Sequence, residues 1–317
     1  MSKGLSKLVG LKDLKEMAMR DIVASRILNE KFPNTGLFGI SGVGKSYFAE
    51  AVAEELRYYF FQIEGSTVST KREIVQLLSK ADEMSKSEGM PLLFFIDEAH
   101  RLGKLQEVLY YPMTKHYIVT KDGIQQFSPF TVFAATTHPH MLLPSFIIRL
   151  TNQWHLYRYS HFEIYDVIAQ EFDKYRIHAK PWLISVIAHR CLGIPRLAAN
   201  LSMKIRNEVI HRSTINGSWA EVTEDDCYKT FDMENIDEIG LRADHINYLK
   251  ELHDSDVPKG IGTIAGKLGL DEEVVSGTIE PILLELHMID LTNRGRIITE
   301  HGIEHLETYH AGILQRK

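Results

Sequence analysis

The residues whose types and spacing suit chemistry best lie in the glycine-rich segment Gly39–Ser46, which reads GISGVGKS. This is the spacing of a phosphate-binding loop, in which glycines let backbone N–H groups turn toward phosphate oxygens. Lys45 adds a positive charge, and the Ser46 hydroxyl can ligate Mg²⁺. A helical pattern follows at Tyr47–Leu56, so a helix N-terminus would face the phosphates. The alternative is a chance glycine turn. The flanking elements favour a site for ATP and Mg²⁺.

Two adjacent carboxylates follow a buried apolar run roughly fifty residues later. The run Pro91–Ile96 ends in Asp97 and Glu98. At the tip of a parallel strand beside a phosphate loop, Asp97 can hold the Mg²⁺ shell, and Glu98 can orient and deprotonate the attacking water. Taken alone, the pair would be read as a solvated acidic turn. Together with the phosphate loop, it predicts nucleotide hydrolysis.

Short apolar runs separated by polar or helical stretches predict the elements that position these residues. They are typical of buried strands in a parallel sheet and lie at Gly36–Ile40, Tyr58–Ile63, Pro91–Ile96, Phe130–Ala135 and Trp154–Tyr159. Residues 5–30 have helical spacing, and an Asp-Gly turn at Lys121-Asp122-Gly123 predicts a hairpin with arms Tyr117–Val119 and Ile124–Phe127.

The remainder of the chain changes character twice. The pattern is all helical from Ser160 to about Asn235, and an acidic stretch, Asp232–Glu238, resembles a boundary. Beyond it, helices at Ile261–Leu270 and Val274–Ile289 and a hairpin at Leu291–Thr299 are typical of a winged helix, with Pro281 expected to interrupt its helix. The prediction is an α/β domain at 1–159, a helical domain at 160–236 and a winged helix at 237–317.

Composition limits the class of protein. The chain has 317 residues, a net charge of −6 and two cysteines, Cys191 and Cys227. It contains no run of about eighteen apolar residues, so no membrane span is expected. Two cysteines exclude a disulfide framework, and we expect a cytoplasmic protein. The negative charge argues against a broadly basic, DNA-coating surface and leaves room for a local cationic element.

The order of motifs resembles that of RuvB, the bacterial Holliday-junction motor of the AAA+ type. A DExH helicase would need a second RecA-like domain, which the helical continuation does not offer. The matching segments run in family order from about residue 8 to the C-terminus: Ile96–Leu102, Glu107–Tyr110, Pro112-Met113, Pro129–Thr131, Ala135–Thr137, Gly193–Arg196, Ile279–Pro281 and Thr292–Arg296. The resemblance implies a five-stranded AAA+ domain, a helical lid and a DNA-binding winged helix in a ring, expected to be hexameric.

The resemblance also implies roles for individual residues. Thr137 matches the sensor-1 residue that feels the γ-phosphate, and Arg149 matches the arginine finger directed into a neighbouring subunit. Arg196 matches the sensor-2 arginine of the lid. With Glu98 and Lys45, Thr137 and Arg149 form the predicted catalytic set. The predicted nucleotide contacts are Leu8, Val9, Gly39, Gly42, Val43, Gly44, Lys45, Ser46, Tyr47, Asp97, Thr136, Thr137, Pro195 and Arg196, with Ser46 and Asp97 on the metal.

The chain departs from the family pattern at three places. The region between Pro112 and Pro129 is shorter than the RuvB hairpin that docks on the junction-binding partner RuvA. The sequence therefore leaves open whether this chain has a RuvA-like partner. Ile147 replaces an additional arginine near the finger, and Lys3-Gly4-Leu5 lacks the family's Arg-Pro. We interpret the chain as a divergent relative of phage or mobile-element type.

The C-terminal domain is acidic, with eight Lys or Arg against thirteen Asp or Glu in residues 241–317. Its predicted phosphate contacts to duplex or junction DNA are Lys259 and Lys267, on the expected helix-turn-helix, and Arg294 and Arg296 on the wing, where the resemblance implies arginines that reach the phosphate backbone. Phosphate contact without base readout suits a motor that acts on any sequence. A protein-interaction winged helix remains the alternative.

Two further patterns are discounted as metal sites. His301–His305 has the H-x-x-E-H order of some zinc peptidases but is expected in an ordinary terminal helix. His138-Pro139-His140 has no ligand cluster nearby and fits a nucleotide-responsive loop better.

The sequence thus predicts an ATP-driven ring motor that moves double-stranded DNA in branch migration. A loader or switch ATPase that places a partner protein on DNA is the first alternative. A scaffold that barely hydrolyses ATP is the second, and the intact Lys45, Asp97 and Glu98 disfavour it.

Overall fold

The structure is a computed structural model that describes residues 4–120, 123–216, 221–255 and 257–315. Lys3 and the Lys121-Asp122 part of the predicted hairpin turn lie outside these residues. The chain divides into two compact units, Met1–Tyr157 and Arg158–Lys317. Within the described ranges, no helix is both long and apolar enough to cross a membrane. Both cysteines are free and buried, as the expected lack of a disulfide framework requires.

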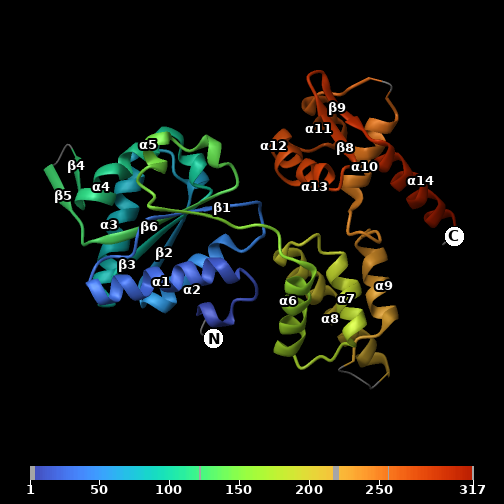
Figure 1. Cartoon of the computed structure of the whole chain (residues 1–317), viewed down its shortest axis with the longest axis horizontal. Coiled ribbons are helices and arrows are strands. Elements are labelled where there is room, and N and C mark those ends of the chain that lie inside the picture. Colours follow the sequence, from blue (N-terminus) through green and yellow to red (C-terminus); the bar gives the residue numbers. More distant parts are fainter. Residues whose placement is uncertain (1–3, 121–122, 217–220, 256, 316–317) are drawn as a thin grey trace. The chain divides into compact units, whose positions relative to one another are not determined.

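The first unit is built on a five-stranded sheet in which every pairing is parallel. The strand order is β2-β3-β6-β1-β7, so the chain crosses the sheet repeatedly through helices (Figure 1). Its strands are β1 (Thr35–Phe38), β2 (Tyr59–Glu64), β3 (Leu92–Asp97), β6 (Phe130–Thr136) and β7 (Asn152–His155). All five predicted strands exist. The fifth was placed wrongly: it begins two residues earlier than expected and ends at His155, because its pairing with β1 involves Asn152 to His155.

Helices cover both faces of this sheet, which is why its strands are apolar without alternation. On one face α1 (Lys12–Leu28) and α2 (Lys45–Leu56) pack against a core that includes Phe48, Phe133 and Trp154. The opposite face is covered by α3 (Lys71–Ser87), the 3-10 helix η3 (Ala99–Leu109), α4 (Tyr110–Lys115) and α5 (Pro144–Ile147). A capping box at Thr70 starts α3, in which the Thr70 hydroxyl accepts from the Glu73 N–H.

The predicted hairpin is present as β4 (Tyr117–Thr120) and β5 (Gly123–Gln126). The two strands pair antiparallel, from Tyr117 with Gln126 to Thr120 with Gly123. Val119 and Ile124 are exposed at 58% and 68%. Four-residue strands with apolar side chains facing solvent form a small projecting surface.

The second unit opens with the predicted all-helical stretch, comprising α6 (His161–Lys174), α7 (Pro181–His189), α8 (Pro195–Asn216) and α9 (Glu224–Met233). Capping boxes at Ser160 and Thr223 begin α6 and α9. Asp226 is fully buried and accepts two hydrogen bonds from the Arg212 guanidinium, which ties α9 to α8.

The winged-helix pattern is also confirmed. It contains α10 (Ala243–His253), α11 (Ile261–Leu268), a helix formed by α12 (Glu272–Val274), a π-turn (Val275–Ile279) and α13 (Glu280–Glu285), the wing strands β8 (Ile289–Thr292) and β9 (Gly295–Ile298), and α14 (Glu300–Gln315). The π-turn lies immediately before Pro281, whose missing N–H and ring interrupt regular α-helix. The predicted helix end at Ile289 was wrong: α13 ends at Glu285, His287 adopts φ +54°, and Ile289 already pairs with Ile298.

Candidate functional site

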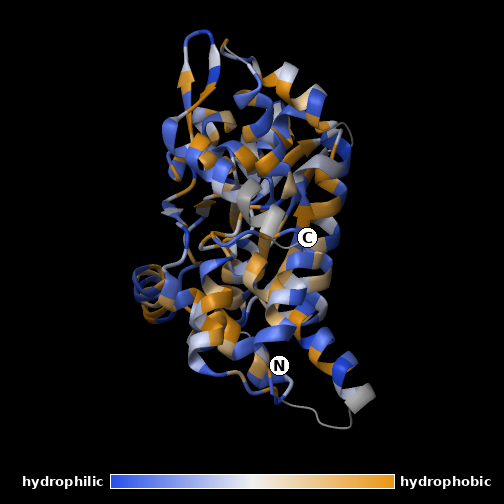
Figure 2. Cartoon of the chain, turned by 90° about the vertical axis from the view of Figure 1, so that its right-hand side faces the viewer, coloured by the Kyte–Doolittle hydropathy of each residue, from blue (hydrophilic) through white to orange (hydrophobic). Residues whose placement is uncertain are grey.

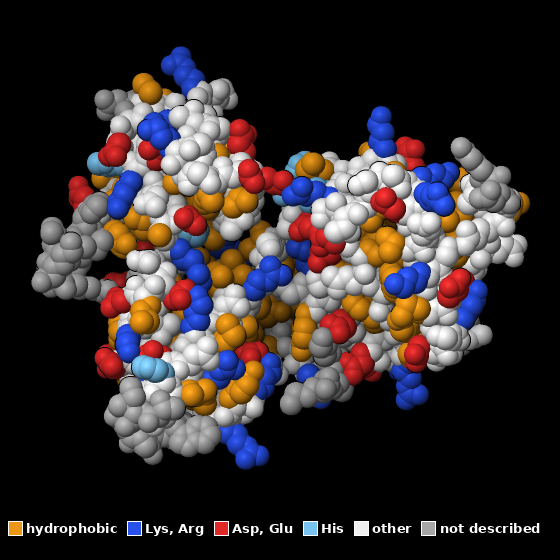
Figure 3. Space-filling model, turned by 180° about the vertical axis from the view of Figure 1, so that it is seen from behind, with side chains coloured by type: hydrophobic (Ala, Val, Ile, Leu, Met, Phe, Trp, Pro, Cys, Tyr) orange, Lys and Arg blue, Asp and Glu red, His pale blue; other side chains and the backbone are white. Residues whose placement is uncertain are grey.

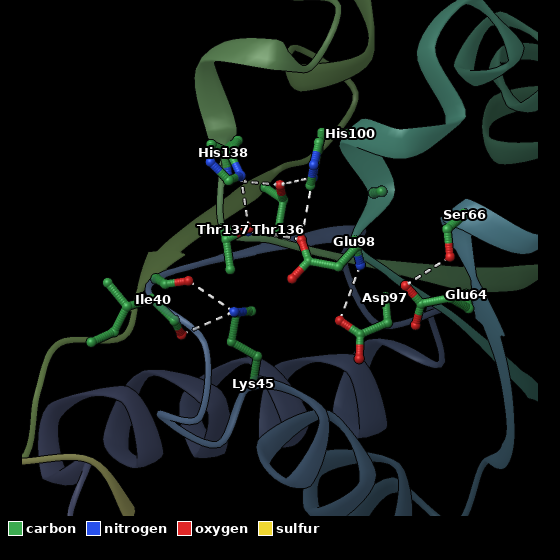
Figure 4. Close-up of polar contacts among 12 residues, drawn as sticks. Ile40, Lys45, Glu64, Ser66, Asp97, Glu98, His100, Thr136, Thr137 and His138 are labelled. Atoms are coloured by element: carbon green, nitrogen blue, oxygen red, sulfur yellow. Dashed lines mark hydrogen bonds and ion pairs between the residues drawn. The ribbon is translucent and has the colours of Figure 1, made fainter. Parts of the chain in front are cut away.

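The phosphate loop lies between β1 and α2, at the carboxyl edge of the sheet. Gly44 adopts φ +96° as the N-cap of α2, a conformation that a side chain would strain. Gly39 lies so close to the residue that follows β7 that a Cβ on it would be 2.3 Å from the Leu156 carbonyl oxygen. The loop therefore needs glycine at these positions for backbone reasons. The buried Lys45 ammonium donates to the carbonyls of Gly39 (2.8 Å) and Ile40 (3.1 Å), inside the loop (Figure 4).

Asp97 joins the loop to the end of β3. The Ser46 hydroxyl donates to Asp97 Oδ2 over 2.9 Å, and the Glu98 N–H donates to Asp97 Oδ1 over 3.0 Å. Two hard oxygen donors, the ligand type that Mg²⁺ takes, thus meet at the start of α2. The structure brings Ser46 and Asp97 together although 51 positions separate them.

Glu98 has the backbone conformation of a constrained residue. Its φ of +43° lies in the left-handed region, which is unfavourable for a residue with a side chain and recurs at functional sites. Its Oε2 accepts from the Thr137 N–H (3.1 Å) and from the Thr137 hydroxyl (3.0 Å). Thr137 follows β6, the strand next to β3, so two neighbouring strand ends deliver the pair.

A third carboxylate, Glu64, belongs to the same edge and was missed by sequence reasoning. It ends β2 and stands in register with Asp97. Burial, followed by the negative charges of Asp97 and Glu98, raises the pKa of Glu64. The available signal was an acidic residue directly after an apolar run. It points to the site only once the strand order is known, because that order places β2 beside β3.

Two histidines lie near Glu98; sequence reasoning gave His100 no role and placed His138 only in a nucleotide-responsive loop. The buried His100 Nδ1 lies 2.8 Å from Thr136 Oγ1 and 3.2 Å from Glu98 Oε2. His138 Nδ1 lies 2.8 Å from Thr137 Oγ1, and the His138 N–H donates to Thr136 Oγ1 over 3.0 Å. The hydroxyl of Thr136, a predicted nucleotide contact, is therefore within hydrogen-bonding distance of both histidines (Figure 4).

The other predicted nucleotide contacts lie in two places. Leu8 is buried at the end of the N-terminal 3-10 helix, and its carbonyl accepts from Lys15 Nζ; Val9 beside it is half-buried. Tyr47 is 43% exposed on α2. Pro195 and Arg196 begin α8 in the second unit, where Arg196 is exposed.

Arg149 follows α5, on the α3 and α4 side of the sheet. Its guanidinium lies over the Tyr110 ring, 4.1 Å from the centroid, and Nη1 donates to the Ser145 carbonyl over 2.5 Å. Tyr110 Oη and Ser145 Oγ are themselves 2.5 Å apart. The side chain is thus held at the half-exposed edge of its own domain, stacked on an aromatic face.

Four cations are predicted to contact DNA. Three of them lie close to a glutamate of the same unit. Arg296 Nε and Nη2 donate to Glu280 Oε1 (2.8 Å) and Oε2 (3.2 Å), and Glu280 is only 4% exposed. Lys259 Nζ lies 2.5 Å from Glu251 Oε1, and Lys267 Nζ lies 3.9 Å from the same oxygen. Arg294 is exposed at the wing tip, with no ion pair recorded for it in the described part of the chain.

The two predicted wing contacts therefore differ in this structure: a buried carboxylate engages the Arg296 guanidinium, whereas the Arg294 side chain is exposed. Figure 2 shows hydrophilic residues at the tip of this hairpin and hydrophobic residues along its strands. On the face that Figure 3 shows, Lys and Arg side chains are interspersed with Asp and Glu, as the net charge of −6 leads one to expect.

His305, in the discounted H-x-x-E-H pattern, lies in α14 as expected. Its Nε2 is 2.9 Å from Asp237 Oδ2, so the ring already has a carboxylate partner.

Comparisons with known proteins agree with this fold. Residues 35–156 match the family described as "ATPase family associated with various cellular activities (AAA)", and residues 238–307 match the "RuvB C-terminal winged helix domain". The Holliday junction branch migration complex subunit RuvB of Ehrlichia chaffeensis is 31% identical over 297 residues, covering 90% of this chain and 86% of that protein. The protein of the same name from Rhodopirellula baltica is 27% identical over 314 residues, covering 96% and 82%.

A solved structure of the Thermotoga maritima RuvB Holliday junction branch migration motor superposes with a TM-score of 0.84 at 26% identity. The match covers 96% of this chain and 97% of that one. The resemblance inferred from the order of motifs is confirmed, as are the AAA+ fold and the winged helix. The chain is an AAA+ ATPase and belongs to the RuvB family.

Proposed function

We propose that this protein uses ATP hydrolysis to move double-stranded DNA during branch migration of Holliday junctions. The main support is that Ser46, Asp97, Glu98 and Thr137 lie together at one edge of the sheet. The same chain also contains a RuvB-type winged helix. Relatives that bear the branch-migration name match it over most of their length.

The residues present suit a magnesium ion. The Ser46 hydroxyl and an Asp97 carboxylate oxygen lie 2.9 Å apart and are the ligand types that Mg²⁺ takes beside nucleotide phosphates. The ion supplies charge neutralisation at the phosphates. Lys45, now bonded to the carbonyls of Gly39 and Ile40, provides the second positive charge and exchanges these contacts for phosphate oxygens.

Glu98 has the geometry of a general base. One carboxylate oxygen is anchored by Thr137, which leaves the other for the proton of the attacking water. Thr137 in turn occupies the place where the resemblance puts the residue that senses the γ-phosphate. Loss of phosphate contact at Thr137 and reorientation of Glu98 are thereby coupled through one side chain.

The finger role of Arg149 implies an oligomer. In its own subunit the guanidinium rests on Tyr110, on a different face of the sheet from α2. A finger acting in a neighbour's site stabilises transition-state charge only after assembly, which couples hydrolysis to ring formation. We therefore propose a homo-oligomeric, hexameric ring. The remaining proposed nucleotide contacts are Leu8, Val9 and Tyr47 in the first unit, and Pro195 and Arg196 in the helical lid.

The hairpin β4–β5 is the proposed docking element for a RuvA-like, junction-binding partner. Its exposed Val119 and Ile124 line an open groove of about 1170 Å³ together with α3, which contributes Lys71, Arg72, Lys80 and Glu83. Apolar side chains beside mainly basic residues suit an apolar partner surface that bears acidic residues. The free, buried cysteines accord with work in the reducing cytoplasm.

A loader remains the second candidate, and one observation favours it. Three of the four cations expected on DNA have a glutamate within 4 Å of their nitrogen atoms, which leaves Arg294 as the wing's exposed charge. A weak DNA grip suits an ATPase that places another protein on DNA more than one that pulls duplex through a ring.

The test combines a synthetic four-way junction, Mg²⁺ and ATP with the purified chain, with and without a RuvA protein. Turnover and strand exchange are measured in the same tube. Branch migration by wild type and none by Glu98→Gln, which should still bind ATP, supports the motor. ATPase stimulated by DNA without strand movement, in every combination, would instead identify a loader or switch.

A further inference from the structure

Thr137 holds Glu98 by a single oxygen. Its N–H and its hydroxyl both reach Glu98 Oε2, at 3.1 and 3.0 Å. Within the described residues no hydrogen bond is recorded for Oε1, and Figure 4 shows this oxygen on the side where Lys45 lies. His100 Nδ1 lies 3.2 Å from the same Oε2. A carboxylate anchored in this way presents Oε1 to the water that it deprotonates, and the Thr137 hydroxyl is one of the groups that fix its geometry.

The Thr137 hydroxyl has a second neighbour. His138 Nδ1 lies 2.8 Å from Thr137 Oγ1, slightly nearer than Glu98 Oε2. The hydroxyl carries one hydrogen, and an ionised carboxylate only accepts, whereas an imidazole nitrogen donates when protonated and accepts when bare. With a hydrogen on Nδ1, the ring donates to Thr137 and the hydroxyl donates to Glu98. With Nδ1 bare, ring and carboxylate compete for the same hydrogen.

The surroundings keep the His138 ring in place for this contact. The His138 N–H donates to Thr136 Oγ1 over 3.0 Å, and the same oxygen lies 2.8 Å from His100 Nδ1. The two imidazole rings pack with their centroids 5.0 Å apart. The backbone and one face of the His138 ring are thus both engaged, with Nδ1 directed at Thr137.

We propose that His138 is a positioning residue for ATP hydrolysis, which carries a hydrogen on Nδ1 and thereby keeps the Thr137 hydroxyl pointed at Glu98. This inference rests on the proposed role of Glu98 as the base. His138 acts through Thr137 and has no contact with nucleotide in this scheme. It also gives a function to His138, which the sequence placed only in a nucleotide-responsive loop.

Two variants of equal size separate this role from simple packing. His138→Asn places an amide N–H where Nδ1 stands, whereas His138→Asp places only acceptors there. We expect His138→Asn to keep kcat within about threefold of wild type and His138→Asp to lower it about tenfold or more, as the loss of one positioning hydrogen bond implies. The KM for ATP and the affinity for a non-hydrolysable ATP analogue should change little in both. Equal kcat values for the two variants, or a fall matched by a rise in KM, would overturn the proposal.

A spectroscopic measurement keeps the test independent of variant folding. In ¹⁵N-histidine-labelled wild type, the His138 ring, assigned by its loss in His138→Asn, should show a protonated Nδ1; a bare Nδ1 contradicts the proposal. The ATP turnover of Glu98→Gln separates the proposed role of Glu98 from that of His138. If Glu98→Gln retains turnover, the proposed base is wrong. If it loses turnover while the Asn and Asp variants behave alike, only the role of His138 fails.

Discussion

The two wing arginines should have opposite phenotypes, although only one residue separates them. Arg296 is bonded through two nitrogens to Glu280, which also accepts from the fully buried Tyr248 hydroxyl over 2.7 Å. Arg296→Ala leaves this carboxylate buried with Tyr248 as its remaining donor. Arg294 is exposed, and Arg294→Ala removes a charge without leaving any buried group unpaired. We therefore expect a stability defect from the first variant and a DNA-binding defect from the second.

The magnitudes follow from burial. Removing one partner of a buried ion pair costs about 3–5 kcal/mol. The Arg296 side chain is 22% exposed and Tyr248 still donates, so we expect about 2–3 kcal/mol. In a unit of this size, that lowers the melting temperature by about 5–10 °C. Arg294→Ala should change stability by less than about 0.5 kcal/mol and flatten the plot of log affinity against log salt by about 0.9.

The assay combines thermal unfolding of the full chain, hydrogen exchange of the wing amides, and duplex binding across a salt series at a temperature where both variants are folded. Replacing both charges, as in Arg296→Met with Glu280→Gln, should recover at least half of the lost stability, because no buried charge then remains unpaired and the amide oxygen still accepts from the Tyr248 hydroxyl. The reasoning is refuted if Arg296→Ala melts like wild type and flattens the salt plot by as much as Arg294→Ala. Arg296 would then contact DNA, and its pair with Glu280 would not persist in solution.

Three further predictions concern hydrolysis and stability. Arg149→Ala and Lys45→Ala should each abolish turnover, and mixtures should regain part of it because the first supplies an intact phosphate loop and the second an intact finger; mixed rings that stay inactive would exclude action across an interface. Asp97→Asn should raise the Mg²⁺ concentration for half-maximal ATPase, whereas Glu98→Gln should leave the Mg²⁺ dependence of ATP binding unchanged; an unaltered Mg²⁺ requirement in Asp97→Asn would remove it from the metal site. Burial lowers the pKa of His245 to about 4, below its usual value of 6.5, so the unfolded chain binds the proton first as pH falls. Stability should therefore decline by about 3 kcal/mol between pH 6.5 and 4, and His245→Leu should lack that part of the decline; identical pH profiles for the two proteins would contradict it.

Much of the architecture was predictable because its causes are local. A glycine-rich loop before a helix, a carboxylate pair after an apolar run and a turn between two short apolar arms each depend on backbone freedom and side-chain period over about ten residues. The phosphate loop, Asp97, Glu98 and the wing hairpin were located in this way. Boundaries were less certain: α13 ends before Ile289 because the left-handed turn at His287 and pairing with Ile298 take precedence over apolar spacing.

What only the tertiary structure decided is which polar group meets which. The sequence alone places Arg294 and Arg296 together at one turn, yet packing brings a buried carboxylate from Glu280 to one of them and none to the other. It also brings Thr137 to Glu98 across 39 positions and leaves His138 as the second neighbour of the same hydroxyl. Hydrogen bonds and ion pairs depend on distances of a few ångströms and on burial. Strand order and helix packing set both quantities, and neither is contained in the periodicity of the chain.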